Sequence, residues 1–112
     1  MIKPVKNELW LVDLTDGKGH EQKGKRPAVV IASFALVEMS LVIPLTSNAS
    51  ASRFPCTIKI MPSKDNGLES ESIALVFQLT SIDNSRLIHK IGKIVEPDQQ
   101  KITALIQEEL RA

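Results

Sequence analysis

Apolar and polar positions alternate over much of the chain, a pattern typical of short β-strands that turn one face to a core. Six stretches carry this alternation or a short apolar run, and turn-forming residues bound them: 8–14, 27–32, 40–46, 54–61, 72–79 and 90–95. Pro44 interrupts the third stretch. Because proline offers no N–H to a neighbouring strand, we expect it near an edge or a bulge.

The period changes near the C-terminus, where Ile102, Leu105, Ile106 and Leu110 recur at helical spacing. Pro97 suits the first helical position, so the pattern predicts a helix over about 97–110. Many short strands and one terminal helix indicate a mainly β (β+α) protein, a small and mostly antiparallel barrel covered by that helix. A chain of 112 residues is expected to be a single domain, 1–112.

The charges change the picture only locally. Fourteen Lys and Arg against thirteen Asp and Glu give a net charge of +1, which argues against a protein that coats nucleic acid. Residues 17–26, however, hold four basic residues and one acidic residue between glycines. This Gly-rich segment predicts a basic loop that can attract a phosphate.

Several other classes of protein are not expected. The longest apolar runs fall short of the ~18 residues of a membrane helix, and the N-terminus lacks the apolar region of a secretory signal, so we expect a cytoplasmic protein and no membrane partner. Cys56 is the only cysteine, which excludes an internal disulfide and a thiolate metal cluster. Its place on an alternating apolar face indicates a core residue.

Chemistry can be placed at two strand ends. Arg26 offers a planar fork of donors that fits a phosphate, and Thr46 and Ser47 follow a buried strand with hydroxyl groups. His20 and Glu21 are neighbours and could transfer protons. Taken singly, each residue has an ordinary reading as a surface charge or as turn chemistry. The spacing of these residues alone therefore predicts only a small β-rich domain with a basic loop.

The residue order resolves this ambiguity. The motifs ELWLVDL at 8–14 and GHEQxGxRPAVV at 19–30 resemble the opening of the MazF/PemK/Kid toxins of toxin–antitoxin systems. Further matches follow in the family's order at VIPLTS (42–47), 54–55, 67–68, Gln78, 82–83, 85–87 and 90–92. The resemblance spans about residues 7–110, nearly the whole chain.

This resemblance implies an SH3-like barrel with helices, of the CcdB/PemK type, that cleaves single-stranded RNA at specific sequences. It implies transesterification by the RNA's own 2′-OH, with no metal and no cofactor. It also implies a homodimer that a cognate antitoxin protein neutralises by covering the RNA groove.

The resemblance also assigns residues. The family's catalytic Arg and Thr fall on Arg26 and Thr46, and the His-Glu pair of the PemK/Kid branch falls on His20 and Glu21. An imidazole titrates nearer neutral pH than a carboxylate does, so both remain candidates for the base. We expect RNA contacts from basic, hydroxyl and aromatic side chains: Lys18, Lys23, Lys25, Ser47, Arg53, Phe77 and Arg86.

One departure from the family matters. Phe77 stands where the family usually has an acidic residue, and Leu75 stands where the PemK/Kid branch has an arginine. The acid–base pair of that branch is therefore absent, which also admits a catalytically weakened homologue. Phe77 either packs in the core, the ordinary place for Phe, or stacks on a base. A further alternative is a toxin of CcdB type, which binds DNA gyrase and cuts no RNA.

Overall fold

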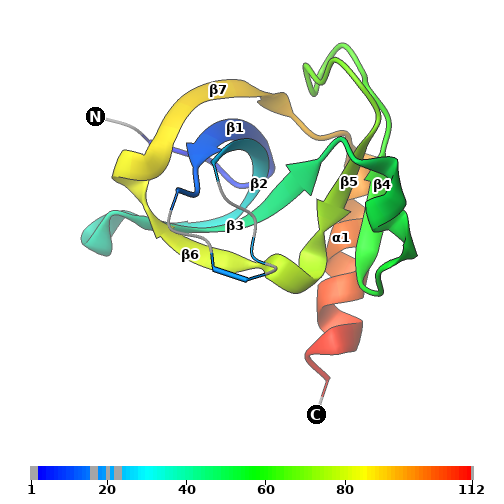
Figure 1. The fold of residues 1–112 in the computed structure, drawn as a ribbon. Coiled ribbons are helices and arrows are strands. Elements are labelled where there is room, and N and C mark those ends of the chain that lie inside the picture. The colour runs from blue at the N-terminus through cyan, green and yellow to red at the C-terminus, as the bar shows by residue number, and fades with distance from the viewer. Residues whose placement is uncertain (1–2, 16–17, 20, 22–23, 112) are drawn as a thin grey trace.

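The computed structural model describes residues 3–15, 18–19, 21 and 24–111. Its seven strands are β1 (Glu8–Asp13), β2 (Lys25–Phe34), β3 (Met39–Thr46), β4 (Thr57–Ile60), β5 (Ser72–Leu75), β6 (Thr80–Asp83) and β7 (Leu87–Lys93). Four short 3-10 helices, η1 (Ala35–Val37), η2 (Ala49–Arg53), η3 (Val76–Gln78) and η4 (Asn84–Arg86), connect them, and α1 (Glu96–Glu109) follows (Figure 1).

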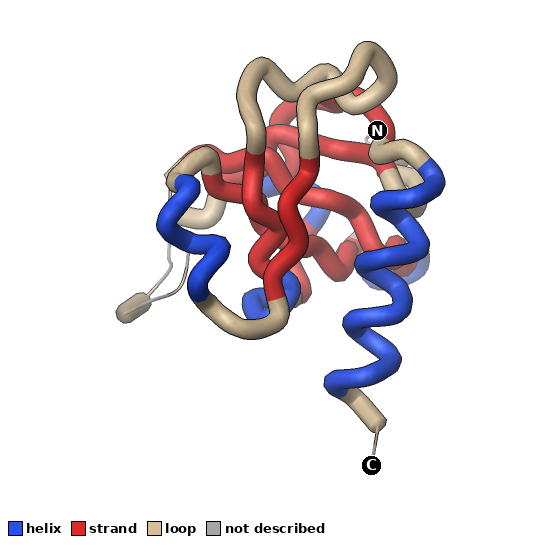
Figure 2. The backbone as a smooth tube through the Cα atoms, turned by 90° about the vertical axis from the view of Figure 1, so that its right-hand side faces the viewer, coloured by secondary structure: helices blue, strands red, loops and turns tan. Residues whose placement is uncertain are grey.

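The strands form one antiparallel sheet with the order β4-β5-β3-β2-β1-β7, and β6 also pairs with β3. The strands from β6 through β3, β2 and β1 to β7 curl into an open barrel, seen on the left of Figure 1. The β4–β5 hairpin extends from the barrel, and α1 runs beside it in both views (Figures 1 and 2). The mainly β barrel with a C-terminal helix is thus confirmed.

Strand β3 is shared between the barrel and the hairpin. Its first half, Met39 to Val42, pairs with β6, whereas Leu45 and Thr46 pair with β5. Pro44 falls between these two partners on that side of β3, and on the other side it lies opposite Ala28 of β2. Pro44, expected near an edge or a bulge, lies in a strand with neighbours on both sides, at the gap between β6 and β5 on one of them. Its missing N–H is tolerated because it lies where β3 changes partner.

Two apolar clusters lie on opposite faces of β1. Leu9 belongs to the larger cluster, with residues of β2 to β5 and Ile102 of α1, whereas Val12 and Leu14 belong to the cluster inside the barrel. This alternation is the one predicted for residues 8–14. Ile102, Leu105 and Ile106 pack α1 on the larger cluster, which confirms the predicted helix and its apolar face up to Ile106, whereas Leu110 is exposed. Among the described residues no helix is both long enough and apolar enough to span a membrane.

Other boundaries differ from the sequence prediction. The strand expected over 72–79 ends at Leu75, and η3 then turns Phe77 outward until its side chain is 47% exposed. Core packing of Phe77 is therefore excluded. The polar loop expected after Thr46 contains η2, capped by the Asn48 side chain, and the four-residue strand β6 was not predicted. Cys56 packs against the larger cluster but precedes β4, with a positive φ of 59°.

A fully buried asparagine, Asn66, holds the turn at residues 65–67. Asn66 Oδ1 accepts hydrogen bonds from the N–H groups of Ser63 and Leu68, and its Nδ2 donates to the carbonyl of Met61. Gly92 of β7 packs directly beneath this turn, where an added Cβ would lie 2.5 Å from the carbonyl oxygen of Asp65. The hydrogen bonds of Asn66 and the close packing of Gly92 therefore fix the position of the turn relative to the barrel.

We predict that Asn66→Ala lowers the free energy of unfolding by about 3 kcal/mol, because three hydrogen bonds are lost and the backbone groups lose their partners. Chemical denaturation monitored by circular dichroism measures this value. The matched control is Asn84→Ala, which removes the single bond between Ser40 Oγ and Asn84 Oδ1 and should cost about 1 kcal/mol. Equal losses in the two variants would contradict the assigned role of Asn66.

Candidate active site

Arg26 and Thr46 meet at the end of the β2–β3 pair. The register places Val30 opposite Val42 and Ala28 opposite Pro44, so its continuation by two residues brings Arg26 level with Thr46. Residues directly opposite in an antiparallel pair share one face of the sheet. Both side chains line one hollow of about 560 Å³, which we call the Arg26 hollow. The structure thus brings together the two residues predicted to act on the phosphate.

The Thr46 side chain is oriented by the chain that follows it. Its Oγ1 accepts a hydrogen bond of 3.2 Å from the N–H of Asn48, and the residue is only 8% exposed. A hydroxyl has one proton to donate and two lone pairs to accept with. Because one lone pair is used by the backbone, the Thr46 hydroxyl is held so that it can donate its proton into the hollow.

The Arg26 hollow is rich in charged and hydroxyl groups. Lys25, Ser47, His89 and Lys90 line it together with Arg26 and Thr46, and Glu69 adds one carboxylate. The cations come from β2 and β7, the two strands that flank β1. An excess of positive charge in a concave site suits a phosphodiester substrate.

A second hollow of about 380 Å³ shares Thr46 with the first. It is lined by Asn48, Ser50, Arg53, Phe54, Phe77 and Gln78, among others, and we call it the aromatic hollow. A third hollow of about 320 Å³ shares Phe77 and Gln78 with the second and reaches Glu21 and Arg86; we call it the Glu21 hollow. The three hollows therefore follow one another along the surface, a shape suited to an extended strand.

Glu21, one of the two predicted proton-transfer residues, lines a different hollow from Arg26. Glu21 lines the Glu21 hollow, where its Oε1 accepts the N–H of Lys18 at 2.9 Å and its own N–H donates to the Lys18 carbonyl. His20 lies outside the described residues, as does the predicted RNA contact Lys23. Glu21 and Arg26 thus lie at separate points along the row of hollows.

The other predicted RNA contacts are distributed along the same row. Lys25 and Ser47 border the Arg26 hollow, and Arg53 and Phe77 border the aromatic hollow. Lys18 is exposed beside Glu21. Arg86 lines the Glu21 hollow, and its positive charge also helps to lower the pKa of the exposed carboxyls of Asp13 and Asp83 below their ordinary value, after the hydrogen bonds from Thr15 and Ser85.

Sequence reasoning missed several lining residues, among them Asn48, Phe54, Gln78, His89 and Lys90. His89 is exposed, and the surface on which it lies is the wall of the Arg26 hollow. The pairing of Leu11 with both His89 and Pro27 places His89 two strands from the start of β2. No local pattern carries this information, because it depends on which strands flank β1.

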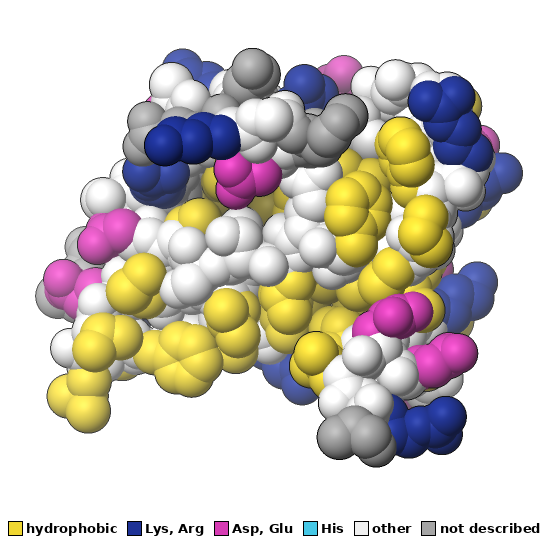
Figure 3. Space-filling model, turned by 60° about the horizontal axis from the view of Figure 1, so that its bottom comes forward, with side chains coloured by type: hydrophobic (Ala, Val, Ile, Leu, Met, Phe, Trp, Pro, Cys, Tyr) yellow, Lys and Arg dark blue, Asp and Glu magenta, His cyan; other side chains and the backbone are white. Residues whose placement is uncertain are grey.

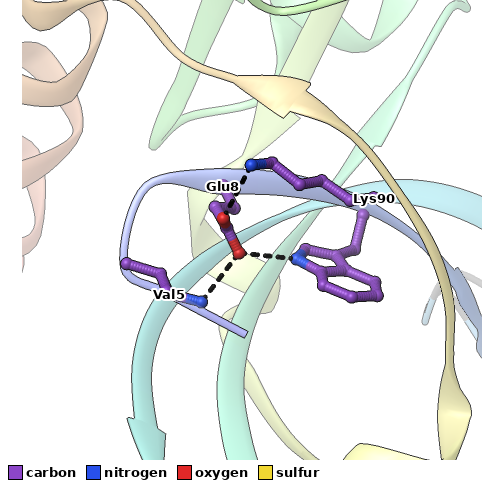
Figure 4. A network of polar contacts seen from close by, with 4 residues as sticks. Val5, Glu8 and Lys90 are labelled. Carbon is purple, nitrogen blue, oxygen red and sulfur yellow. Dashed lines mark hydrogen bonds and ion pairs between the residues drawn. The ribbon is translucent and has the colours of Figure 1, made fainter. Parts of the chain in front are cut away.

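A buried carboxylate anchors Lys90 at the rim of the hollow (Figure 4). Glu8 Oε2 lies 2.9 Å from Lys90 Nζ, while Oε1 accepts hydrogen bonds from the N–H of Val5 and from Trp10 Nε1. Burial alone would raise the pKa of Glu8, but the bonds from Lys90, Trp10 and Val5 outweigh it and hold the pKa below the ordinary value of 4.5. The carboxylate therefore ties β1, β7 and the N-terminal segment together.

The comparisons with known proteins identify the family of the chain. The family model for PemK-like, MazF-like toxins of type II toxin–antitoxin systems matches residues 6–110. Endoribonuclease MazF9 of Mycobacterium tuberculosis is 30% identical over 97 residues, which cover 80% of each chain.

Solved structures share the fold. The crystal structure of MazF from Deinococcus radiodurans superposes with a TM-score of 0.79 at 23% identity and covers 96% of both chains. A mycobacterial endoribonuclease in complex with its cognate antitoxin superposes with a TM-score of 0.73 at 15% identity, covering 98% of this chain and 99% of the other. At these identities the likeness concerns the fold.

We predict that the Glu8 carboxylate makes stability depend on pH. Because its pKa is lower in the folded chain, its contribution is complete above pH 4.5 and is lost as the pH falls through the folded pKa. Glu8→Gln cannot titrate and loses the ion pair with Lys90, so it should be less stable by about 1–2 kcal/mol at pH 7 and change less between pH 7 and pH 3.

Thermal unfolding at a series of pH values checks this prediction. The control is Glu71→Gln, which removes an exposed pair whose Glu71 carboxylate lies 3.4 Å from Lys59 Nζ. Exposed pairs contribute about 0–1 kcal/mol, so this variant should keep the pH profile of the wild type. A Glu8→Gln profile parallel to the wild type would exclude the carboxylate as the source.

Proposed function

Because the chain belongs to the PemK-like, MazF-like toxins of type II toxin–antitoxin systems, we propose that it is a sequence-specific endoribonuclease that cleaves single-stranded RNA. The observation that carries this proposal is the meeting of Arg26 and Thr46 at one hollow, where a guanidinium and an oriented hydroxyl can hold the same phosphate. MazF9, the relative from Mycobacterium tuberculosis, is an endoribonuclease, which supports this proposal.

The proposed reaction is a transesterification. The 2′-OH of the RNA attacks the adjacent phosphorus, the 5′-oxygen of the next nucleotide leaves, and the products are a 2′,3′-cyclic phosphate and a 5′-hydroxyl. Negative charge builds on the non-bridging oxygens of the phosphorane. Arg26 stabilises that charge with its fork of N–H donors, and the Thr46 hydroxyl donates a hydrogen bond to one of the same oxygens.

The proton transfers remain predictions for His20 and Glu21. Removal of the 2′-OH proton and protonation of the leaving oxygen both need a group within hydrogen-bond reach of the reacting atoms. Glu21 lines the hollow that lies two along the row from the Arg26 hollow, away from a phosphate bound at Arg26. His89 already borders the Arg26 hollow.

The family membership also supports a proposal about partners. We infer that the chain acts as a cytoplasmic homodimer and that a cognate antitoxin neutralises it, as the mycobacterial relative is seen with its antitoxin. The row of hollows with Lys25, Arg53 and Lys90 at its rim gives an acidic segment of such an antitoxin the same attraction that an RNA strand has. The CcdB-type alternative, a gyrase-binding protein without nuclease activity, is not favoured, because the matching family and relative are of the MazF type.

The first test is cleavage itself. We predict that the purified protein cuts RNA in the presence of EDTA, leaves 2′,3′-cyclic phosphate ends, and leaves a DNA copy of the same sequence intact because DNA lacks the 2′-OH. Arg26→Ala should lower the cleavage rate by about 10²–10³-fold, the usual loss when a donor to a developing oxyanion is removed. Gel analysis of end-labelled oligonucleotides measures both effects.

The matched control for Arg26→Ala is Arg111→Ala, which removes an exposed guanidinium beyond the C-terminal end of α1. This variant should cut RNA at the wild-type rate. Cleavage of DNA, or a strict requirement for a divalent metal, would rule out the proposed mechanism.

A second test distinguishes the contribution of the Thr46 hydroxyl from that of the side-chain volume. Thr46→Val keeps the volume and removes the donor, and it should lower the cleavage rate by about 10²-fold. Thr46→Ser keeps the hydroxyl and should retain most of the activity. Single-turnover rates at saturating RNA distinguish the two variants, and equal rates for Val and Ser would remove the hydroxyl from the reaction.

A further inference from the structure

An exposed aromatic pair borders the row of hollows. Phe54 and Phe77 are 43% and 47% exposed, although phenylalanine is normally a core residue. Their ring centroids lie 6.1 Å apart in an edge-to-face arrangement, and the Arg53 guanidinium carbon lies 5.1 Å from the centre of the Phe54 ring. Figure 3 shows hydrophobic side chains gathered in a band on one face of the molecule. The pair therefore lies at the surface, where it can contact a bound strand.

The pair lies beside the residues that hold the phosphate. Phe54, Phe77 and Arg53 line the aromatic hollow, and Thr46 lines both this hollow and the Arg26 hollow. When a phosphate is bound at Arg26 and Thr46, the base of a neighbouring nucleotide therefore falls at the aromatic pair. A volume of about 380 Å³ is enough for one nucleobase with its sugar.

We propose that Arg53, Phe54 and Phe77 form a base-stacking subsite that binds one unpaired nucleobase next to the cleaved phosphate. This proposal rests on the proposed endoribonuclease activity and names the part of the site that holds the base. Unpaired bases stack on Phe rings and on Arg guanidinium planes, and an edge-to-face pair uses the edge of one ring, so both faces of that ring stay uncovered by the other. The subsite therefore holds the base by stacking on its flat face.

The polar rim of the hollow gives the subsite its selectivity. Asn48 Oδ1 already accepts hydrogen bonds from the N–H and the hydroxyl of Ser50. The part of Asn48 that a base can use is therefore its Nδ2 amide, a donor. A donor at this place favours a base that presents a carbonyl or a ring-nitrogen acceptor on its edge.

The subsite is preformed. The Phe77 N–H donates to the carbonyl of Cys56 at 3.2 Å, and the N–H of Phe54 donates to the carbonyl of Ala51. Beneath η2, Ala51 packs on Ile73 and Leu75 in a small buried cluster. Because these contacts hold the backbone on both sides of the aromatic pair, little freedom is lost when a base binds.

The test uses the full chain and an RNA oligonucleotide in which the cleavage position has been mapped. Each base in turn is replaced by an abasic site, and the cleavage rate at subsaturating RNA is measured for the wild type and for Phe77→Leu, Phe54→Leu and Phe77→Trp. Leu keeps apolar bulk without a stacking face, and Trp keeps the face. The matched control is Phe34→Leu, because Phe34 is 48% exposed but lies at the opposite end of β2 from Arg26.

We expect one abasic position adjacent to the cut to lower wild-type cleavage by about 10-fold, the usual effect of losing one stacked base. Phe77→Leu should lower cleavage of intact RNA by a similar factor, and the abasic change should then have no further effect, because both remove the same contact. Phe34→Leu should cut as the wild type does, and Phe77→Trp, which keeps a stacking face, should cut faster than Phe77→Leu. A binding measurement checks the same contact. RNA that carries 2-aminopurine at that position should lose fluorescence when it binds the Arg26→Ala variant. The same RNA should keep its fluorescence when it binds the double variant with Arg26→Ala and Phe77→Leu.

Two results would overturn the subsite alone. In the first, Phe77→Leu and Phe54→Leu cleave RNA at the wild-type rate. In the second, the abasic site lowers the cleavage rate of Phe77→Leu by the same factor as that of the wild type. A wild type that cuts no RNA at all would instead overturn the proposed function on which the subsite rests.

Discussion

The double pairing of β3 is the constraint on which the remaining structure depends. On one side β3 pairs with β2 from Met39 to Pro44, and on the other it pairs first with β6 and then with β5. This arrangement joins barrel and hairpin through one strand, with Pro44 at the change of partner. It also fixes where β3 ends, so that Thr46 lies level with Arg26 and between two hollows. The site is a consequence of the sheet register.

The sequence predicts those features that follow from a repeating period. The alternation around Trp10 and Val12, the apolar runs of β2 and β3, and the helical spacing from Ile102 to Ile106 all appear where the pattern places them. These stretches bury apolar area over several residues, so tertiary contacts reinforce the local preference. The family resemblance adds Arg26 and Thr46, whose meeting in space the structure then displays.

Features that depend on a single turn could not be predicted in this way. Residues 76–78 continue an apolar run, yet they form a 3-10 turn that points Phe77 to the solvent, and β6 has too few residues to show a period. His89 and Lys90 reach the Arg26 hollow only because β7 pairs with β1. Glu21, near Arg26 in the chain, faces a different hollow because β2 begins at Lys25 and leads away from the loop.

The two kinds of chemistry lie on different parts of the scaffold. Arg26 and Thr46 belong to strands of the sheet and cannot move without disturbing its core, whereas Arg53, Phe54 and Phe77 lie on or beside two short 3-10 helices at the surface. Substitutions in η2 and η3 therefore leave the residues proposed to cut RNA in place. Through evolution, related chains can keep one way of breaking RNA while each comes to attack a different set of transcripts.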